Sequence, residues 1–115
     1  MAKVRYSPLA QDDLLAIQEY IGVDLASPLA AKNIVGTITE RVRSLATAPE
    51  IGTPLSAICN KDSDYRFLVC KKYLVFYRYE KGNVLIVRVL YGGRDYLTIL
   101  FRDELGDDPI NLYEK

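Results

Sequence analysis

The chain has 115 residues, half of them hydrophobic, and its 15 Lys and Arg balance its 15 Asp and Glu. This length fits one domain of ordinary size, and the apolar content supports a packed core, which excludes wholesale disorder. Zero net charge argues against indiscriminate nucleic-acid binding, which usually rests on a strongly basic domain.

The N-terminal half predicts a short strand at residues 3–6, where the residues alternate in character, and then two helices. Ser7-Pro8 and Ser27-Pro28 are helix starts, because a serine oxygen caps free backbone N–H groups and proline fits the first helical position. Behind these starts, apolar residues recur every three or four positions: Ala10, Leu14, Ile17 and Ile21, then Ala31, Ile34, Ile38, Val42 and Leu45. The helices should end near residues 22–24 and before Pro49.

The middle of the chain predicts strands at residues 64–70, 73–80 and 84–91, which are rich in aromatic and β-branched residues. The last of these runs is apolar on both faces and suits a central strand. Such short connections make neighbouring strands antiparallel. Residues 96–101 fit a short strand or a helix. The sequence therefore predicts an α+β fold, with an N-terminal helical hairpin on one face of a small antiparallel sheet and the other face partly open.

The charges are unevenly distributed. Residues 61–94 carry eight Lys or Arg against three Asp or Glu, whereas residues 95–115 carry two against six. We therefore expect a domain at residues 1–102 and an acidic C-terminal tail at residues 103–115. The basic part either attracts an acidic partner or a phosphate backbone, or is an ordinary solvated strand face.

The composition also indicates the compartment. No apolar run approaches the roughly 20 residues of a membrane-spanning helix, and the first residues lack the apolar core of a secretory signal. Cys59 and Cys70 are too few for a disulfide framework, so we expect two reduced thiols. The prediction is a cytoplasmic protein without membrane contact.

The chain lacks the residues that several common kinds of catalytic site require. The chain has no His, no cysteine pair with zinc spacing, no Gly-rich phosphate loop and no serine nucleophile elbow. We therefore expect no metal, no cofactor and no conventional hydrolase site. The adjacent carboxylates Asp12-Asp13 and Asp107-Asp108 are expected on the solvated surface.

Arginine and tyrosine remain as candidate functional residues. Guanidinium groups hold phosphates or carboxylates, and tyrosines stack on bases or form hydrogen bonds. The arginines on or just beyond the predicted strands are Arg66, Arg78, Arg88 and Arg94, and the tyrosines among them are Tyr65, Tyr73, Tyr77, Tyr79, Tyr91 and Tyr96. Arg88 interrupts an apolar strand, where a charge is costly without a partner. It either faces a cleft or pairs with an acid such as Asp95 or Glu80.

The order and spacing of several segments resemble the RelE/ParE toxin superfamily over about residues 3–96. The first segment is Tyr6-Ser7-Pro8 with Ala10, Asp13, Leu14, Ile17 and Tyr20-Ile21. Residues 45–54 are similar to the family's "LxxxPxxGxP" link, and Tyr65-Arg66 and residues 73–78 follow. Residues 86–95 look like the ParE-type ending "IxRVLHGRRD". The resemblance implies the toxin of a bacterial type II toxin–antitoxin pair, held in a hetero-oligomer by a cognate antitoxin whose acidic residues meet toxin arginines.

Two mechanisms occur in this superfamily. RelE-like members cut messenger RNA at the ribosome, and ParE-like members inhibit DNA gyrase without known chemistry of their own. Ribonuclease members often carry an arginine where this chain has Leu74, and a late tyrosine where it has Leu100, although Tyr96 is close. The ParE-like branch is therefore favoured, with binding rather than an enzymatic reaction. A ribosome-dependent endoribonuclease and a non-toxic relic that only binds antitoxin are the alternatives.

The resemblance and the arginine pattern together assign candidate site residues. In the ribonuclease alternative, Arg66, Arg88 and Arg94 clamp the phosphate and Tyr91 or Tyr96 assists proton transfer. For partner binding, the expected residues are Arg66, Arg78, Arg88, Arg94 and Tyr77. We expect these arginines on the sheet face away from the helices, open to an acidic partner.

Overall fold

The computed structural model describes residues 1–57, 63–93 and 96–100. The N-terminal elements are β1 (Lys3–Tyr6), α1 (Pro8–Glu19), the π-helical turn η1 (Tyr20–Asp24), α2 (Pro28–Arg43) and the 3₁₀ turn η2 (Ser44–Ala46). The later elements are β2 (Thr53–Pro54), η3 (Leu55–Ala57), β3 (Tyr65–Cys70), β4 (Tyr73–Glu80), β5 (Asn83–Tyr91) and α3 (Tyr96–Leu100). Cys59, Arg94 and the expected acidic tail lie outside the described residues.

The described strands form one five-stranded sheet in the order β1-β5-β4-β3-β2. β3, β4 and β5 are antiparallel neighbours, as predicted from their short connections. β1 instead runs parallel to β5, with Lys3 opposite Asn83 and Tyr6 opposite Ile86. The expectation of a wholly antiparallel sheet is wrong at this edge. The helical hairpin follows β1 and provides the long crossover that parallel pairing requires.

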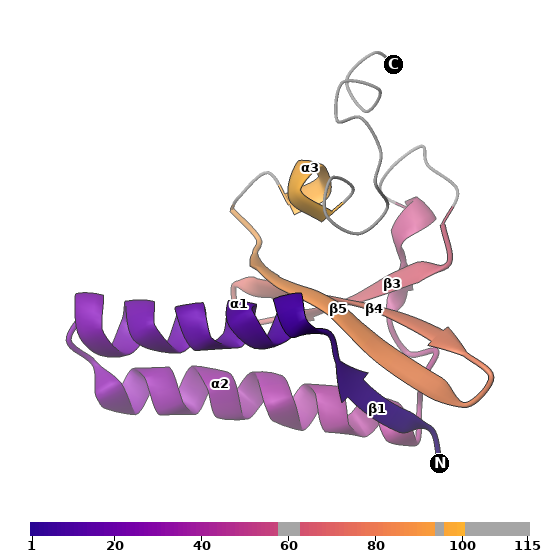
Figure 1. The fold of residues 1–115 in the computed structure, drawn as a ribbon, viewed down its shortest axis with the longest axis horizontal. Coiled ribbons are helices and arrows are strands. Elements are labelled where there is room, and N and C mark those ends of the chain that lie inside the picture. Colours follow the sequence, from indigo (N-terminus) through magenta and orange to yellow (C-terminus); the bar gives the residue numbers. More distant parts are fainter. Residues whose placement is uncertain (58–62, 94–95, 101–115) are drawn as a thin grey trace.

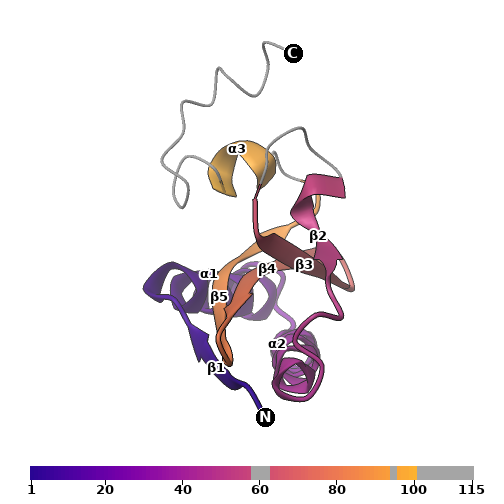
Figure 2. The ribbon, with the colours of Figure 1, turned by 90° about the vertical axis from the view of Figure 1, so that its right-hand side faces the viewer.

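The helical hairpin, α1 and α2, covers one face of the sheet (Figures 1 and 2). The predicted apolar stripes of both helices point toward the strands. We call the buried cluster between them the helix-side core; its members include Ala10, Ile17, Ile38, Val42, Leu68, Val75, Tyr77, Ile86 and Val89. Both helices extend past the end of the sheet, so the far end of the hairpin projects from the molecule (Figure 1). The predicted α+β hairpin-on-sheet architecture is confirmed.

The other face of the sheet is less open than expected. α3 lies across it, on the side opposite the hairpin (Figure 2). A second buried cluster, the far-side core, consists of Leu55, Tyr65, Leu74, Phe76, Val87, Leu90 and Leu100. The Tyr96 ring packs against Phe76 at a centroid distance of 5.7 Å. Residues 96–100 are thus a short helix that buries apolar sheet surface, which resolves the alternative left open by the sequence.

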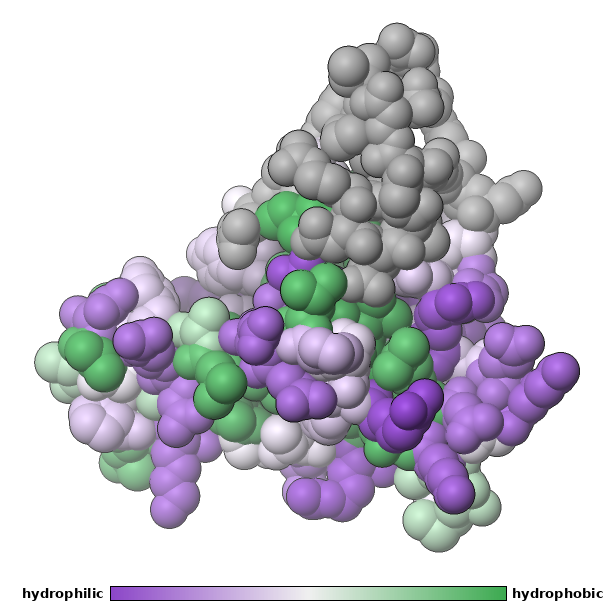
Figure 3. All heavy atoms as spheres, viewed as in Figure 1, coloured by the Kyte–Doolittle hydropathy of each residue, from purple (hydrophilic) through white to green (hydrophobic). Residues whose placement is uncertain are grey.

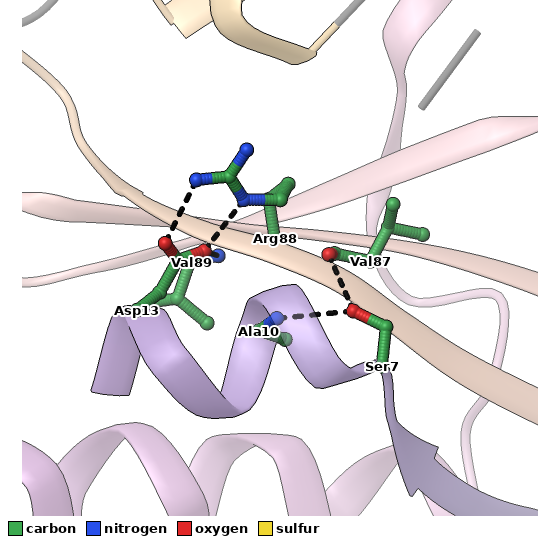
Figure 4. Close-up of polar contacts among 6 residues, drawn as sticks. All are labelled: Ser7, Ala10, Asp13, Val87, Arg88 and Val89. Atoms are coloured by element: carbon green, nitrogen blue, oxygen red, sulfur yellow. Dashed lines mark hydrogen bonds and ion pairs between the residues drawn. The ribbon is translucent and has the colours of Figure 1, made fainter. Parts of the chain in front are cut away.

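Where β1 ends, the start of α1 continues along the edge of β5. The Ser7 N–H donates to the Ile86 carbonyl at 2.9 Å, and the Ser7 hydroxyl donates to the Val87 carbonyl at 2.8 Å. The same hydroxyl oxygen accepts from the Ala10 N–H at 3.0 Å, so Ser7 caps α1 as predicted (Figure 4). One serine therefore connects the start of the helix to the strand edge.

A β-bulge interrupts the pairing of β4 with β5. Phe76 lies opposite Arg88, but the next residue, Tyr77, lies opposite Ile86, so Val87 is the extra residue of β5. A bulge reverses the side-chain alternation along the rest of its strand. Ile86 and Val89 accordingly both belong to the helix-side core, although they are three residues apart. The simple two-residue alternation assumed for this strand fails at Val87.

Candidate functional site

Arg88 forms a nearly buried ion pair with Asp13 of α1. Its Nε and Nη2 each donate to a different carboxylate oxygen at 2.8 Å (Figure 4). One of these oxygens also accepts from the backbone N–H of Val89 at 2.9 Å. The two side chains are only 10% and 13% exposed. This bidentate pair neutralises the arginine charge inside the fold and holds α1 against β5.

The expectation that Asp13 belongs to a solvated carboxylate pair is wrong. Asp12 is exposed, whereas Asp13 faces β5 beside Ala10 and Ile17. The spacing of three and four residues from these two buried neighbours puts Asp13 at the border of the apolar stripe. That position, together with an arginine in an apolar strand, was the available signal for the pair.

Arg66 and Tyr77 hold the connection that follows the helices. The Tyr77 hydroxyl donates to the Pro49 carbonyl at 2.8 Å and accepts from the Gly52 N–H at 2.9 Å. Arg66 donates to the carbonyls of Glu50 at 3.1 Å and Gly52 at 2.7 Å. Tyr77 is fully buried, and burial is the main cause that raises its pKa. Tyr77 was predicted to bind a partner, but its ring lies in the helix-side core and exposes no surface to one.

Arg66 also differs from the prediction, which put the candidate arginines on the sheet face away from the helices. Leu68 and Cys70 of the same strand belong to the helix-side core. Strand alternation therefore puts Arg66 on the face that carries the hairpin. It remains half-buried at the edge of this face, and among the described residues no carboxylate forms an ion pair with it.

Arg78 is the most exposed of the described candidate arginines. Its guanidinium forms a two-pronged contact with Asp64, with Nη2 to Oδ2 at 2.9 Å, and lies 5.4 Å from the centroid of the Tyr65 ring. The Asp64 carboxylate raises the pKa of Arg78, first of all through these hydrogen bonds. Both side chains are about half exposed, so this pair adds little to stability. A partner that binds here competes with Asp64.

The structure does not bring Tyr91 together with Arg66. Arg66 lies opposite Tyr77, which lies opposite Ile86, five residues before Tyr91 on β5. Five strand residues span about 17 Å. The Tyr91 ring instead packs edge-on against Tyr73 at 5.9 Å. Arg94 lies outside the described residues, so the set proposed for phosphate cleavage is not assembled from the described part of the chain.

A groove of about 1000 Å³ lies between the projecting half of the hairpin and the nearby ends of β4 and β5. No pattern in the sequence points to this site. Its helical wall consists of Asp13, Ala16, Ile17, Tyr20, Ile21, Leu25, Ala30 and Ile34. Its sheet wall consists of Lys71, Lys72, Tyr73, Val89, Leu90 and Tyr91. The groove is therefore largely apolar. Its sheet wall adds two lysines and two tyrosines, and its helical wall adds one tyrosine, Tyr20.

The groove is open and its mouth is amphipathic. Tyr20, Leu25 and Tyr91 are 52%, 55% and 44% exposed. Lys71 and Lys72 are exposed at the connection between β3 and β4. Burial raises the pKa of Tyr73, and the nearby Tyr20 and Tyr91 raise it further. All three tyrosines line the groove. Tyrosines beside apolar residues are typical of protein-binding surfaces.

The end of the hairpin adds further apolar surface outside the groove. Val23 and Leu29 are each 70% exposed. On the face drawn in Figure 3, hydrophobic residues reach the surface among hydrophilic ones along the hairpin and where it meets the sheet. These residues extend the exposed apolar surface from the groove to the end of the hairpin.

Residues 1–57, 63–93 and 96–100 contain no helix that is both long and apolar enough to cross a membrane. They also contain no cluster of three or more acidic or cysteine side chains able to hold a metal ion. Cys70 is a free thiol in the helix-side core, and burial raises its pKa. The groove is thus the best-formed candidate among the described residues.

Comparison with known proteins agrees with the fold. The sequence model of a family described as "ParE toxin of type II toxin-antitoxin system, parDE" matches residues 4–96. No curated protein matches the chain. A solved structure, "Chromosomal ParDE TA system from P. aeruginosa", is similar in fold, with a TM-score of 0.66 and 23% identity over 79% of this chain and 96% of that chain. The family match covers most of the sequence and both walls of the groove, and the chain belongs to the ParE family of type II toxins.

Proposed function

We propose that this ParE-family toxin arrests growth in the cytoplasm by binding DNA gyrase, and that a cognate antitoxin neutralises it by occupying the groove. One observation favours binding over RNA cleavage: two of the candidate arginines form their contacts inside the fold. Arg88 is matched by Asp13, and Arg66 is bonded to the backbone of the 49–52 connection. A cleavage site without histidine needs several cations directed at the phosphate.

The groove supports the antitoxin part of the proposal. It is an apolar concavity with Lys71 and Lys72 at one end, so it favours a segment with apolar anchors and nearby acids. An amphipathic helix or an extended strand with such residues fits this description. We propose that Tyr20, Leu25 and Tyr91 supply the anchoring contacts, because each is exposed and lines the groove.

The target is tested with purified toxin in two parallel assays. We expect loss of gyrase supercoiling at micromolar toxin, with intact messenger RNA in a ribosome-containing translation mixture. Cleaved message with unchanged supercoiling would reject the gyrase proposal in favour of the ribonuclease alternative. Unimpaired growth on forced expression would instead support a non-toxic relic.

The groove is tested with a matched pair of substitutions at the end of the hairpin. Leu25→Asp puts a charge into the groove, whereas Val23→Asp puts the same charge on a neighbouring exposed residue that does not line it. We expect Leu25→Asp to weaken binding of the antitoxin encoded beside the toxin by at least tenfold, with Val23→Asp close to wild type. Calorimetry measures both affinities, and equal affinities would remove the groove from the antitoxin interface.

A further inference from the structure

The groove leaves apolar side chains uncovered in the isolated chain. Tyr20 and Leu25 each expose about half of their surface beside it. Apolar surface next to two lysines attracts a segment with apolar residues and acids. The same chain contains such a segment beyond the described residues.

Residues 107–113 read Asp-Asp-Pro-Ile-Asn-Leu-Tyr. Two carboxylates come first, and the apolar residues Ile110 and Leu112 follow at a spacing of two. Pro109 disfavours a helix at Asp108 and favours an extended backbone, in which Ile110 and Leu112 share a side. The groove has the complementary arrangement, with Lys71 and Lys72 at the sheet end and apolar side chains of the hairpin beyond them.

The start of this segment is close enough to reach the groove. Leu100, the last described residue, belongs to the far-side core together with Leu90. Leu90 also lines the groove. The seven residues from Leu100 to Asp107 span up to about 23 Å when extended. Asp107 is therefore within reach of the part of the groove that Leu90 lines.

We propose that residues 107–113 of this chain dock in its own groove, with Asp107 and Asp108 at Lys71 and Lys72 and with Ile110 and Leu112 among the apolar side chains of the hairpin. The docked tail covers apolar surface that the free toxin otherwise exposes. The regulatory consequence rests on the proposed function: an antitoxin that uses the groove must displace the tail, so the tail lowers antitoxin affinity.

Docking is tested on the full-length chain alone with a carbodiimide, which joins a carboxylate to an amine without a spacer. We expect amide cross-links from Asp107 or Asp108 to Lys71 or Lys72, identified by mass spectrometry of digested monomer. Lys81, an exposed lysine at the β4–β5 turn, is the control amine. Cross-linking to Lys81 as often as to Lys71 and Lys72 would overturn the proposal.

A mixture of ¹⁵N-labelled and unlabelled chains separates docking within one chain from docking between two. We expect each cross-linked pair of peptides to carry one isotope only. Pairs that combine both isotopes would show that the occupant is the tail of a second copy, which also overturns the proposal. Because neither gyrase nor antitoxin is present, the result is independent of the growth and supercoiling assays.

Two substitutions in the tail test the apolar contact. Ile110→Asp and Asn111→Asp add the same charge at adjacent positions, but only the first removes an apolar side chain. Loss of the burial of one isoleucine lowers the docking equilibrium about tenfold. We therefore expect Ile110→Asp to reduce the cross-link yield about tenfold, whereas Asn111→Asp leaves it unchanged or raises it. Equal yields in the two variants would show simple charge attraction and reject docking of the apolar residues.

Discussion

The backbone N–H of Gly52 donates to the phenol oxygen of Tyr77 at 2.9 Å, across 25 residues of sequence. The approach is so close that a β-carbon at position 52 would lie 2.6 Å from this oxygen and 2.9 Å from the Phe67 carbonyl. The glycine is therefore required by the space around it. The contact fixes the connection between the hairpin and the sheet.

Gly52→Ala should destabilise the fold by about 1–3 kcal/mol, because either the tyrosine or the connection must move. Gly36 is the control, since a β-carbon there meets nothing within 4 Å and the residue lies inside α2. Gly36→Ala should raise the free energy of unfolding by about 0.5–1 kcal/mol. Urea denaturation measures both, and a neutral Gly52→Ala would mean that the connection adapts freely.

Tyr77→Phe should lower the free energy of unfolding by about 1–3 kcal/mol at neutral pH, because buried backbone groups at Pro49 and Gly52 lose their partner. The difference depends on pH. Burial raises the pKa of Tyr77 above its ordinary value of about 10, so folding favours the protonated phenol. The stabilisation is fully present below about pH 10 and is lost as the pH rises through the raised pKa.

The difference between wild type and Tyr77→Phe should therefore shrink as the pH rises above about 10. Tyr6 and Tyr73, whose pKa values burial also raises, titrate in both proteins and cancel in the comparison. Urea unfolding followed by circular dichroism from pH 7 to pH 11 makes the measurement. A difference that stays constant or grows toward alkaline pH would contradict the assigned direction.

Asp13→Asn should destabilise the fold by about 3 kcal/mol, because it removes the Asp13 carboxylate from its bidentate contact with the nearly buried Arg88. The neighbouring Asp12→Asn makes the same change on an exposed residue and should stay within about 0.5 kcal/mol of wild type. Adding Arg88→Gln to Asp13→Asn should cost less than Arg88→Gln alone, since paired residues are not additive. Additive losses would show that the pair is not coupled.

Ser7→Ala should cost about 1–2 kcal/mol, because the hydroxyl caps α1 and also donates to the Val87 carbonyl. Ser27 precedes α2 in the same Ser-Pro context but makes no side-chain cap bond. Ser27→Ala should therefore have a clearly smaller effect. Thermal unfolding of the two variants compares them directly, and equal losses would argue against the strand contact as the source of the difference.

Much of the fold follows from local sequence patterns. Some features depend only on neighbouring residues, and the structure confirms them. They are the helix starts at Ser7-Pro8 and Ser27-Pro28 and the two strands around the Lys81-Gly82 turn. The parallel pairing of β1 with β5 depends on residues 80 positions apart, for which a single sequence contains no periodic signal. The bulge at Val87 likewise became visible only from the register of two strands.

The site was harder to predict than the fold. Charge was the feature used to choose Arg78 and Arg88, yet the structure pairs these arginines with Asp64 and Asp13. An ion pair formed across the fold cannot be distinguished in sequence from a charge that awaits a partner. The groove was missed because its walls come from three separate segments, and its apolar residues look like ordinary core positions in sequence.

The parallel pairing of β1 with β5 has a consequence for how the protein is made. The first strand to leave the ribosome has its partner at residues 83–86, and the α1 carboxylate meets its arginine only at residue 88. Contacts over such separations form late. A chain that ends before β5 lacks both the partner strand of β1 and the arginine that pairs with Asp13, and we expect it to be a substrate for proteases rather than a folded domain. A cell that begins to translate this toxin is thus spared its effect until nearly the whole domain has been synthesised.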